Sequence, residues 1–105
     1  MEMNQVRYFL AVCETRNFTR AAKRCHVSQP ALTTSIKKLE DEMGAELFHR
    51  DRGAVSLTAL GQQLFPRFQR LSQESASIGV VAENHRRLKQ VPLRVGALST
   101  VAPAR

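Results

Sequence analysis

Three short apolar repeats follow one another up to Gly44, and the residues between them are helix caps and breakers. Apolar residues spaced i, i+3, i+4 and i+7 form one face of an amphipathic helix. In the first two repeats these positions are Val6, Phe9, Leu10 and Cys13, then Phe18, Ala21, Ala22 and Cys25. The pattern therefore predicts a helix from Asn4 to about Thr15, followed by the N-cap residue Asn17 and a shorter helix that ends near His26.

A third helix begins sharply after Ser28, a good N-cap residue. Gln29 and Pro30 open it, and proline is tolerated there because amides of the first turn have no partner within the helix. The helix is predicted to run to about Met43, with Gly44 just past its end. Only residues 26–28 separate it from the second helix, and two short helices joined in this way are typical of a helix-turn-helix.

Residues 46–57 differ from the helical segments. Leu47 to Arg50 and Val55 to Leu57 have strand-like character, and the turn-like Asp51-Arg52-Gly53 lies between them. We therefore expect a small β-hairpin, or wing, over about residues 46–57.

A long helix is predicted over residues 59–90, with Thr58 as its cap. Its seam positions step by four and three in turn, which is the heptad pattern of paired helices. These positions are Leu64, Phe68, Leu71, Ser75, Ile78, Ala82 and His85, and the predicted dimer contacts are Leu64, Phe68, Leu71, Ile78 and Ala82. Pro66 predicts a kink, and Ser75 and His85 weaken the seam, so we expect a bent and modestly stable coiled-coil contact.

The last segment, residues 91–105, predicts the start of another domain. Pro92 breaks the long helix, and Leu93 to Leu98 alternate like a first strand. The chain stops inside this segment, which favours a truncated form of a longer protein. The expected fold class is mainly α, with a winged helix-turn-helix of three helices and a small β-hairpin over residues 1–58, then the linker helix over residues 59–90.

The charge of the chain favours a polyanionic partner. Sixteen Lys and Arg residues against nine Asp and Glu give a formal net charge of +7. Between Glu14 and Glu40 there is no acidic residue at all, and the basic residues of that window are Arg16, Arg20, Lys23, Arg24, Lys37 and Lys38. The total charge alone leaves both nucleic acid and an anionic membrane open.

The third predicted helix has a face suited to reading DNA. Leu32, Ile36, Leu39 and Met43 share one side and are expected to be buried. The opposite side carries Gln29, Pro30, Thr33, Thr34, Lys37 and Asp41. Gln can pair with adenine in the major groove, and Thr or Pro can contact a thymine methyl group. We therefore predict base-reading roles for Gln29, Pro30, Thr33 and Thr34.

Basic residues flank this face and are suited to phosphates, which set register without reading sequence. The wing brings Arg50 and Arg52 to a tight turn that suits a narrow minor groove. The predicted phosphate or minor-groove contacts are Thr19, Arg20, Ser28, Lys37, Lys38, Arg50 and Arg52.

Other chemistry finds little support. His26, His49 and His85 share no metal-ligand spacing with each other or with the cysteines. The carboxylates near the end of the third helix accompany no nucleophile or phosphate-binding loop, so we predict no enzyme. Cys13 and Cys25 fall at apolar positions and are expected to be core thiols. The hypothesis that Cys25 senses peroxide conflicts with the inertness of a buried thiol.

No stretch resembles a secretion signal or a membrane span, so we expect a cytoplasmic protein. A membrane-surface role for the basic end of the long helix would need apolar bulk opposite Arg86, Arg87 and Lys89. Val80, Val81 and Leu88 supply little of it. We therefore predict no membrane partner.

Over residues 2 to about 90, the sequence resembles the amino-terminal domain of LysR-type transcriptional regulators of bacteria. The matching residues are Phe9, Asn17-Phe18-Thr19-Arg20-Ala21-Ala22, Val27-Ser28-Gln29-Pro30-Ala31-Leu32, Ile36-Lys37-Lys38-Leu39-Glu40, Gly44, Leu47-Phe48-His49-Arg50 and Leu57-Thr58-Ala59-Leu60-Gly61. A set of this length in this order is highly specific. The resemblance departs at Thr33, where Ser is common, at Thr34, where a longer side chain is common, and at Leu60, where Ala is usual.

The resemblance implies a helix-turn-helix motif over about residues 18–37 that binds an interrupted palindrome in promoter DNA. It also implies a homodimer through the linker helix, with tetramers and RNA polymerase as further candidate partners. No cofactor is expected in this chain, because a small co-inducer would bind an effector domain of which residues 91–105 resemble only the first strand. The alternative is a basic dimerisation fragment that modulates a full-length regulator without reading sequence itself.

Overall fold

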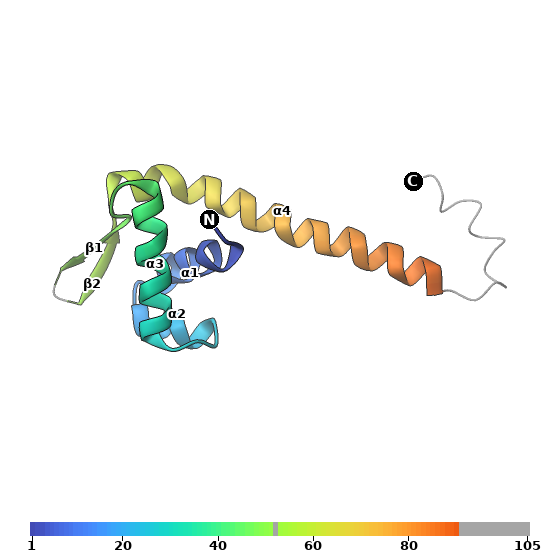
Figure 1. Ribbon diagram of the computed structural model, residues 1–105, viewed down its shortest axis with the longest axis horizontal. Helices are drawn as coiled ribbons and strands as arrows, with labels where there is room; N and C mark the ends of the chain where they lie inside the picture. The colour runs from blue at the N-terminus through green and yellow to red at the C-terminus, as the bar shows by residue number, and fades with distance from the viewer. Residues whose placement is uncertain (52, 91–105) are drawn as a thin grey trace. The chain divides into compact units, whose positions relative to one another are not determined.

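The computed structural model describes residues 1–51 and 53–90 (Figure 1). It contains four helices and one hairpin over these residues, and it divides into two compact units, Met1–Glu74 and the part from Ser75 onward. The elements are α1 (Met3–Thr15), α2 (Phe18–Arg24), α3 (Gln29–Met43), β1 (Phe48–Asp51), β2 (Ala54–Leu57) and α4 (Ala59–Gln90). The predicted strand after Pro92 and the wing residue Arg52 lie outside the described residues. The observed order is that of a winged helix-turn-helix followed by a long helix, as the sequence predicted.

Side-chain caps start the two helices of the helix-turn-helix where the sequence predicted. The Asn17 side chain accepts a hydrogen bond from the Arg20 amide at 2.9 Å, and the Ser28 hydroxyl accepts one from the Ala31 amide at 3.2 Å. α2 ends at Arg24, so residues 25–28 connect the helices, one residue more than expected. His26 in this connection has a left-handed backbone with φ of 60°.

The core of the first unit lies where α1, α2, α3, β1 and the beginning of α4 meet. The predicted buried stripe of α3 is confirmed for Leu32, Ile36 and Leu39, which are fully buried, while Met43 is half-buried. Aromatic rings join the elements, because the Phe9 ring lies 5.2 Å from the Phe48 ring and 4.8 Å from the Phe68 ring, centroid to centroid. These contacts tie the wing and α4 to the first helix.

The wing is a two-stranded antiparallel hairpin in which Phe48 pairs with Leu57 and Asp51 with Ala54. Thr58 closes the base of the hairpin: its amide donates to the Leu47 carbonyl at 3.0 Å, and its hydroxyl donates to the Glu46 carbonyl at 2.7 Å. The same hydroxyl accepts the Gly61 amide at 3.0 Å, which confirms Thr58 as the cap of α4. One residue therefore ends the wing and begins the long helix.

The structure corrects the predicted seam at Phe68. This side chain is only 5% exposed and packs against Phe9, so its own domain already covers it. Leu64 is also half-buried against the same core. The core of the same chain therefore covers Phe68 fully and Leu64 in part, and the dimer contacts of Leu64, Leu71, Ile78 and Ala82 stay predictions. α4 continues as one helix through Pro66, and the kink expected there stays a prediction.

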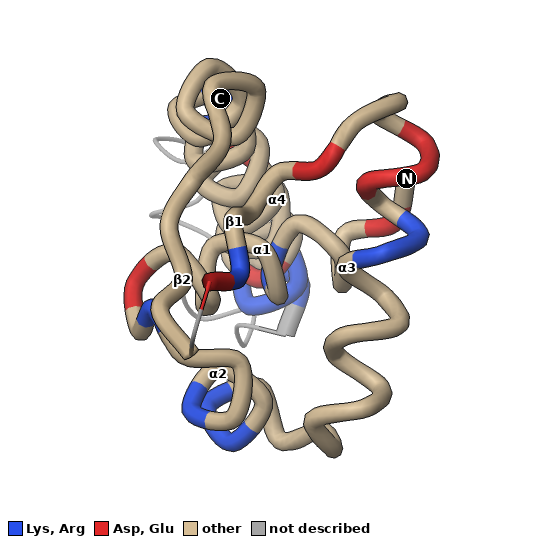
Figure 2. Tube along the Cα trace, turned by 90° about the vertical axis from the view of Figure 1, so that its left-hand side faces the viewer, with Lys and Arg blue, Asp and Glu red and all other residues tan. Residues whose placement is uncertain are grey.

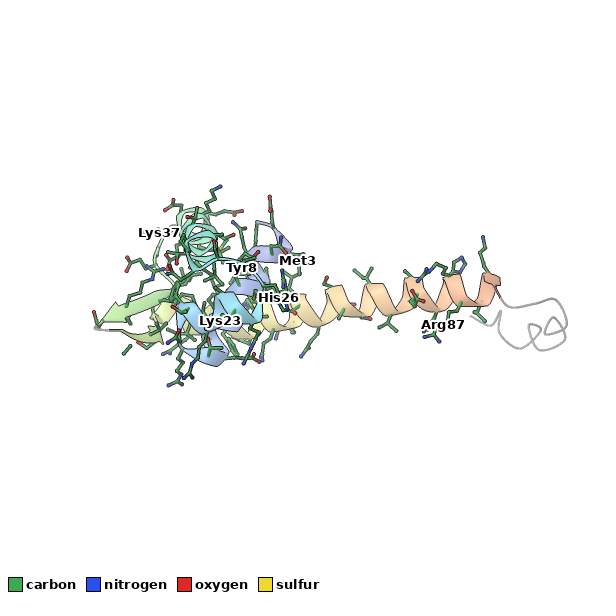
Figure 3. The ribbon with its side chains drawn as sticks, turned by 90° about the horizontal axis from the view of Figure 1, so that it is seen from below. Met3, Tyr8, Lys23, His26, Lys37 and Arg87 are labelled. Carbon is green, nitrogen blue, oxygen red and sulfur yellow. The ribbon has the colours of Figure 1, made fainter. Side chains whose placement is uncertain are left out.

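In the second unit, the described helical stretch of α4 has its large apolar side chains in solvent. Ile78 is 65% exposed, Val80 58%, Val81 65% and Leu88 57%. Figure 3 shows side chains standing out around this stretch of helix, Arg87 among them. Glu83 forms ion pairs with Arg86 and Arg87, which are surface contacts of small energy.

Candidate nucleic-acid interface

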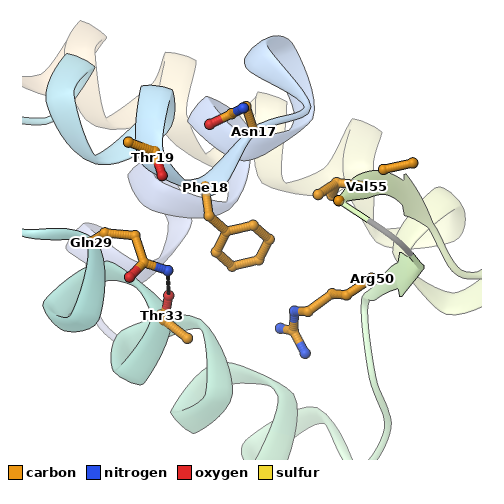
Figure 4. Close-up of a pocket in the computed structure, with 9 residues that line it drawn as sticks. Asn17, Phe18, Thr19, Gln29, Thr33, Arg50 and Val55 are labelled. Atoms are coloured by element: carbon orange, nitrogen blue, oxygen red, sulfur yellow. Dashed lines mark hydrogen bonds between the residues drawn. The ribbon is translucent and has the colours of Figure 1, made fainter.

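The amino-terminal half of α3 presents the predicted recognition face. Gln29, Pro30 and Thr34 are exposed and Thr33 is half-buried. The Gln29 amide nitrogen donates a hydrogen bond to the Thr33 hydroxyl at 2.8 Å, one helical turn along (Figure 4). This contact restrains the Gln29 side chain and leaves its carbonyl oxygen unengaged by Thr33. A polar surface with one hydrogen-bonded side-chain amide therefore lies at the start of α3.

A groove separates this face from the wing. It has a volume of about 350 Å³, and Figure 4 shows Phe18 and Arg50 pointing into the space between α2, α3 and the hairpin. Its lining residues are Asn17, Phe18, Thr19, Gln29, Thr33, Arg50, Gly53, Ala54 and Val55. The structure thus brings Thr19, Gln29, Thr33 and Arg50 of the predicted site together in one place.

Exposed basic side chains border the same region. Arg20 and Lys23 lie on α2, and Lys37 and Lys38 lie on α3. Figure 2 shows basic positions on α2 and α3, and acidic positions toward the carboxyl end of α3. Asp and Glu are absent from residues 15–39, so the charged side chains of α2 and of α3 up to Lys38 are all basic.

The structure places Arg50 differently from a freely exposed wing residue. Its guanidinium donates to the Glu40 carboxylate at 3.1 Å and lies 5.1 Å from the centre of the Phe18 ring. The Arg50 side chain is 30% exposed. Arg50 is therefore held at the edge of the groove by contacts from α3 and α2.

Sequence reasoning missed Glu40, which is only 6% exposed. It stands in the charged run Glu40-Asp41-Glu42, which is typical of a solvated surface. The available signal was its position four residues after Ile36, which places it beside the buried stripe. A carboxylate there must find hydrogen-bond donors, and the entry to the wing supplies them.

The cysteines agree with the prediction of thiols at apolar positions, since both are free, Cys25 is buried and Cys13 is half-buried. Burial, with a smaller contribution from the Glu14 charge, raises the pKa of the Cys13 thiol to about 12. In the described part of the chain, no group of three or more His, Cys, Asp or Glu residues is arranged to hold a metal ion. Over the same residues, no helix is both long and apolar enough to span a membrane.

A helix-turn-helix, a wing and a basic border together define a DNA-binding winged helix, and comparison with known proteins narrows this class. The family described as "Bacterial regulatory helix-turn-helix protein, lysR family" matches residues 3–62. Since that match covers more than half of the 105 residues, the chain belongs to the lysR family.

Individual relatives agree with this assignment. The DNA-binding transcriptional dual regulator OxyR of Escherichia coli is 36% identical over 103 residues, which are 98% of this chain and 34% of that protein. The regulator IlvR of Caulobacter vibrioides is 39% identical over 104 residues, 99% of this chain and 34% of that protein. The chain thus spans about a third of the length of these curated relatives. They are regulators, in agreement with the prediction that the chain is not an enzyme.

Solved structures share the fold. The complex of the CbnR DNA-binding domain with DNA superposes with a TM-score of 0.75 at 35% identity, covering 82% of this chain and 99% of that one. Full-length OxyR from Pseudomonas aeruginosa gives a TM-score of 0.77 at 38% identity, covering 80% of this chain and 28% of that one. The winged helix-turn-helix fold is therefore confirmed.

Proposed function

We propose that this chain is the DNA-binding part of a bacterial transcription regulator that recognises promoter DNA sequence-specifically. The observation that carries the proposal is the ordered Gln29–Thr33 pair at the exposed start of α3, beside a groove that the wing closes on its other side. Because a recognition helix reads bases with its amino-terminal residues, this geometry favours α3 in the major groove and the wing at the minor groove. The structural relative CbnR was solved as a complex of its DNA-binding domain with DNA, which supports a DNA-binding role for this chain.

Different residues carry different parts of the binding. Base edges are assigned to the exposed Gln29, Pro30 and Thr34 and to the half-buried Thr33 between them on α3. Phosphates are assigned to the exposed or capping residues Thr19, Arg20, Ser28, Lys37 and Lys38. We assign Arg52 to the minor groove because the sequence places it in the turn-like Asp51-Arg52-Gly53 of the wing. Such a division separates specificity from general affinity.

Pairing of two chains through α4 is the second part of the proposal. The exposed Leu71, Ile78 and Ala82 continue the heptad spacing beyond Phe68, which lies in the core, and Leu64, which is partly buried against it. A dimer would suit an interrupted palindrome, with tetramers formed by the full-length protein. A small co-inducer would bind outside this chain. The proposed role in transcription also implies RNA polymerase as a partner and the cytoplasm as the location.

The pairing can be tested with Ile78→Glu, which places a charge on the seam. Val80→Glu is a matched control, since Val80 is also exposed but lies on another side of the same helix. We expect sedimentation velocity to show monomers for Ile78→Glu and dimers for Val80→Glu. Equal behaviour of the two variants would contradict the seam.

The DNA-reading proposal is tested by a salt-series titration on random duplex and on a library of interrupted palindromes. We expect steep salt dependence together with selection of particular sites. Gln29→Ala should lose about 1–3 kcal/mol of discrimination at one base pair while the fold stays intact. Gln69→Ala, at an exposed glutamine of α4, is the control.

Steep salt dependence without selection would contradict the proposal and leave a basic dimerisation fragment. The DNA-bound structural relative does not favour that alternative. If Gln29→Ala weakened binding equally on every DNA sequence, Gln29 would be assigned to the DNA backbone and not to the bases.

A further inference from the structure

Glu40 is a buried carboxylate whose two oxygens are both engaged. Oε2 accepts the Leu47 amide at 2.7 Å and the Phe48 amide at 3.3 Å, and Oε1 accepts the Arg50 guanidinium at 3.1 Å. Leu47 and Phe48 are the entry to the wing, so a single side chain of α3 holds both the backbone of the wing and its arginine. Glu42, two residues later, is exposed and forms an ion pair with the amino terminus.

Arg50 is held from two directions. Glu40 engages one of its terminal nitrogens, and the Phe18 ring of α2 lies under the guanidinium. Phe18 itself is fixed by an edge-on contact with Phe48, with centroids 5.9 Å apart. The guanidinium has further donors that Glu40 does not occupy, and they border the groove that contains Gln29. Arg50 is therefore an oriented donor with its charge balanced inside the protein.

We propose that Glu40 is a positioning residue for Arg50. It weakens the general attraction of Arg50 for DNA phosphates, and it orients the guanidinium for a contact at the selected DNA site. The inference rests on the proposed function, because it concerns the same DNA surface. A free arginine that neutralises a phosphate releases a counterion whatever the sequence, whereas an arginine paired with a buried carboxylate carries little net charge. Glu40 thereby lowers binding to random DNA and raises the ratio of selected to random binding.

Glu40→Gln is the direct test. Its carbonyl can still accept the Leu47 amide, but its NH₂ group cannot accept a hydrogen bond from Arg50, so the guanidinium is released. We expect random duplex at low salt to bind roughly 5-fold tighter, with a log–log salt slope steeper by about 1, as one added phosphate contact requires. The ratio of selected to random binding should fall about tenfold in the same series, because the oriented contact is lost.

Glu42→Gln is the matched control, because it removes the same charge from the same helix without touching Arg50. It should leave the salt slope and the ratio of selected to random binding near the values of the unmodified chain. The double variant Glu40→Gln with Arg50→Met should lose the added slope, since the released cation is gone. Equal slopes for Glu40→Gln and Glu42→Gln, or an added slope that persists without Arg50, would overturn the inference.

Two further measurements keep the inference testable without that variant. If Glu40→Gln does not fold, Arg50→Met should leave the salt slope on random duplex unchanged and weaken only selected sites; a slope reduced by about 1 would refute the proposal. Without DNA, NMR relaxation of the Arg50 Nε–H group should show a restrained side chain, and a freely moving one would refute it too. Failure of the unmodified chain to select any site would instead count against the proposed function alone.

Discussion

Large apolar side chains are mostly buried in residues 1–74, whereas those of residues 75–90 are exposed. In the first unit Val6, Phe9 and Leu32 are fully buried, whereas in the second Ile78 and Val81 are each 65% exposed. The first unit therefore has its own core, while the second is a stretch of helix that tertiary contacts within the described chain do not stabilise. An isolated helix is marginal in water, so helix propensity alone gives this stretch little stability, and the proposed pairing of two chains would add to it.

The largest expected effect is at Phe9. Its ring is fully buried between Phe48 and Phe68, so Phe9→Ala should lower the free energy of unfolding by about 3–5 kcal/mol. Ile78→Ala removes an exposed side chain and should stay within about 0.5 kcal/mol under dilute, monomeric conditions. Urea unfolding of both variants measures the difference. Similar losses would mean that the two units do not differ in packing.

Two glycines of α4 sharpen the contrast. A Cβ on Gly61 would lie 2.3 Å from the Leu47 carbonyl oxygen, a backbone atom, whereas a Cβ on Gly79 would meet nothing within 4 Å. Gly61→Ala should therefore destabilise the first unit by about 1–3 kcal/mol. Gly79→Ala should raise helicity and stabilise the helix by up to about 1 kcal/mol. Circular dichroism with thermal unfolding separates them, and a shift of the same sign for both would contradict this account.

A smaller effect is expected at Asn17. Its side chain caps α2, a helix of only seven residues, so Asn17→Ala should cost about 1 kcal/mol. Asn17→Asp retains the acceptor and should keep most of the stability. Chemical denaturation of the pair tests the cap, and equal losses for Ala and Asp would exclude it.

The smallest effect concerns Cys13 at the edge of the core: it is a loss of stability at alkaline pH, and no such loss is expected near neutral pH. Burial raises the pKa of this thiol from 9.0 to about 12, so the folded state binds the proton more tightly than the unfolded state. The corresponding stability is present below about pH 9 and is lost as the pH rises toward 12. Alkylation of Cys13 at pH 8, followed by mass spectrometry, should be much slower in the native chain than in urea. Equal rates would show that the thiol is not protected.

Local rules predicted most of the first unit. The caps Asn17 and Ser28, the end of α3 at Gly44 and the hairpin all depend on short-range chemistry that the sequence displays. The recognition face followed from the buried stripe of α3, because the side opposite Leu32 and Ile36 must be exposed. Base-reading roles on that face remain proposals, since they depend on a partner outside the chain.

The missed features depend on contacts between distant residues. A heptad pattern states that one side of a helix is covered but not by what, so Phe68 was assigned to a second chain although its own domain covers it. Glu40 stands in an acidic run of a kind typical of solvated surfaces, and only the fold places the Leu47 amide beside it. Arg50 was predicted to contact DNA from the wing turn, and its ion pair with Glu40 could not be predicted because it depends on the same fold.

The closure of the wing by Thr58 has a consequence for how such a domain can change. Both ends of the hairpin are tied at its base by bonds between Thr58 and residues 46 and 47, and the core contact of Phe48 lies at the same end. We therefore expect the tip between Asp51 and Ala54 to accept insertions, because each doubling of loop length raises the free energy of loop closure by only about 0.6 kcal/mol. Wings of different length and charge could be exchanged there, which would alter the proposed contact of the wing with DNA while the hydrophobic core keeps its stability.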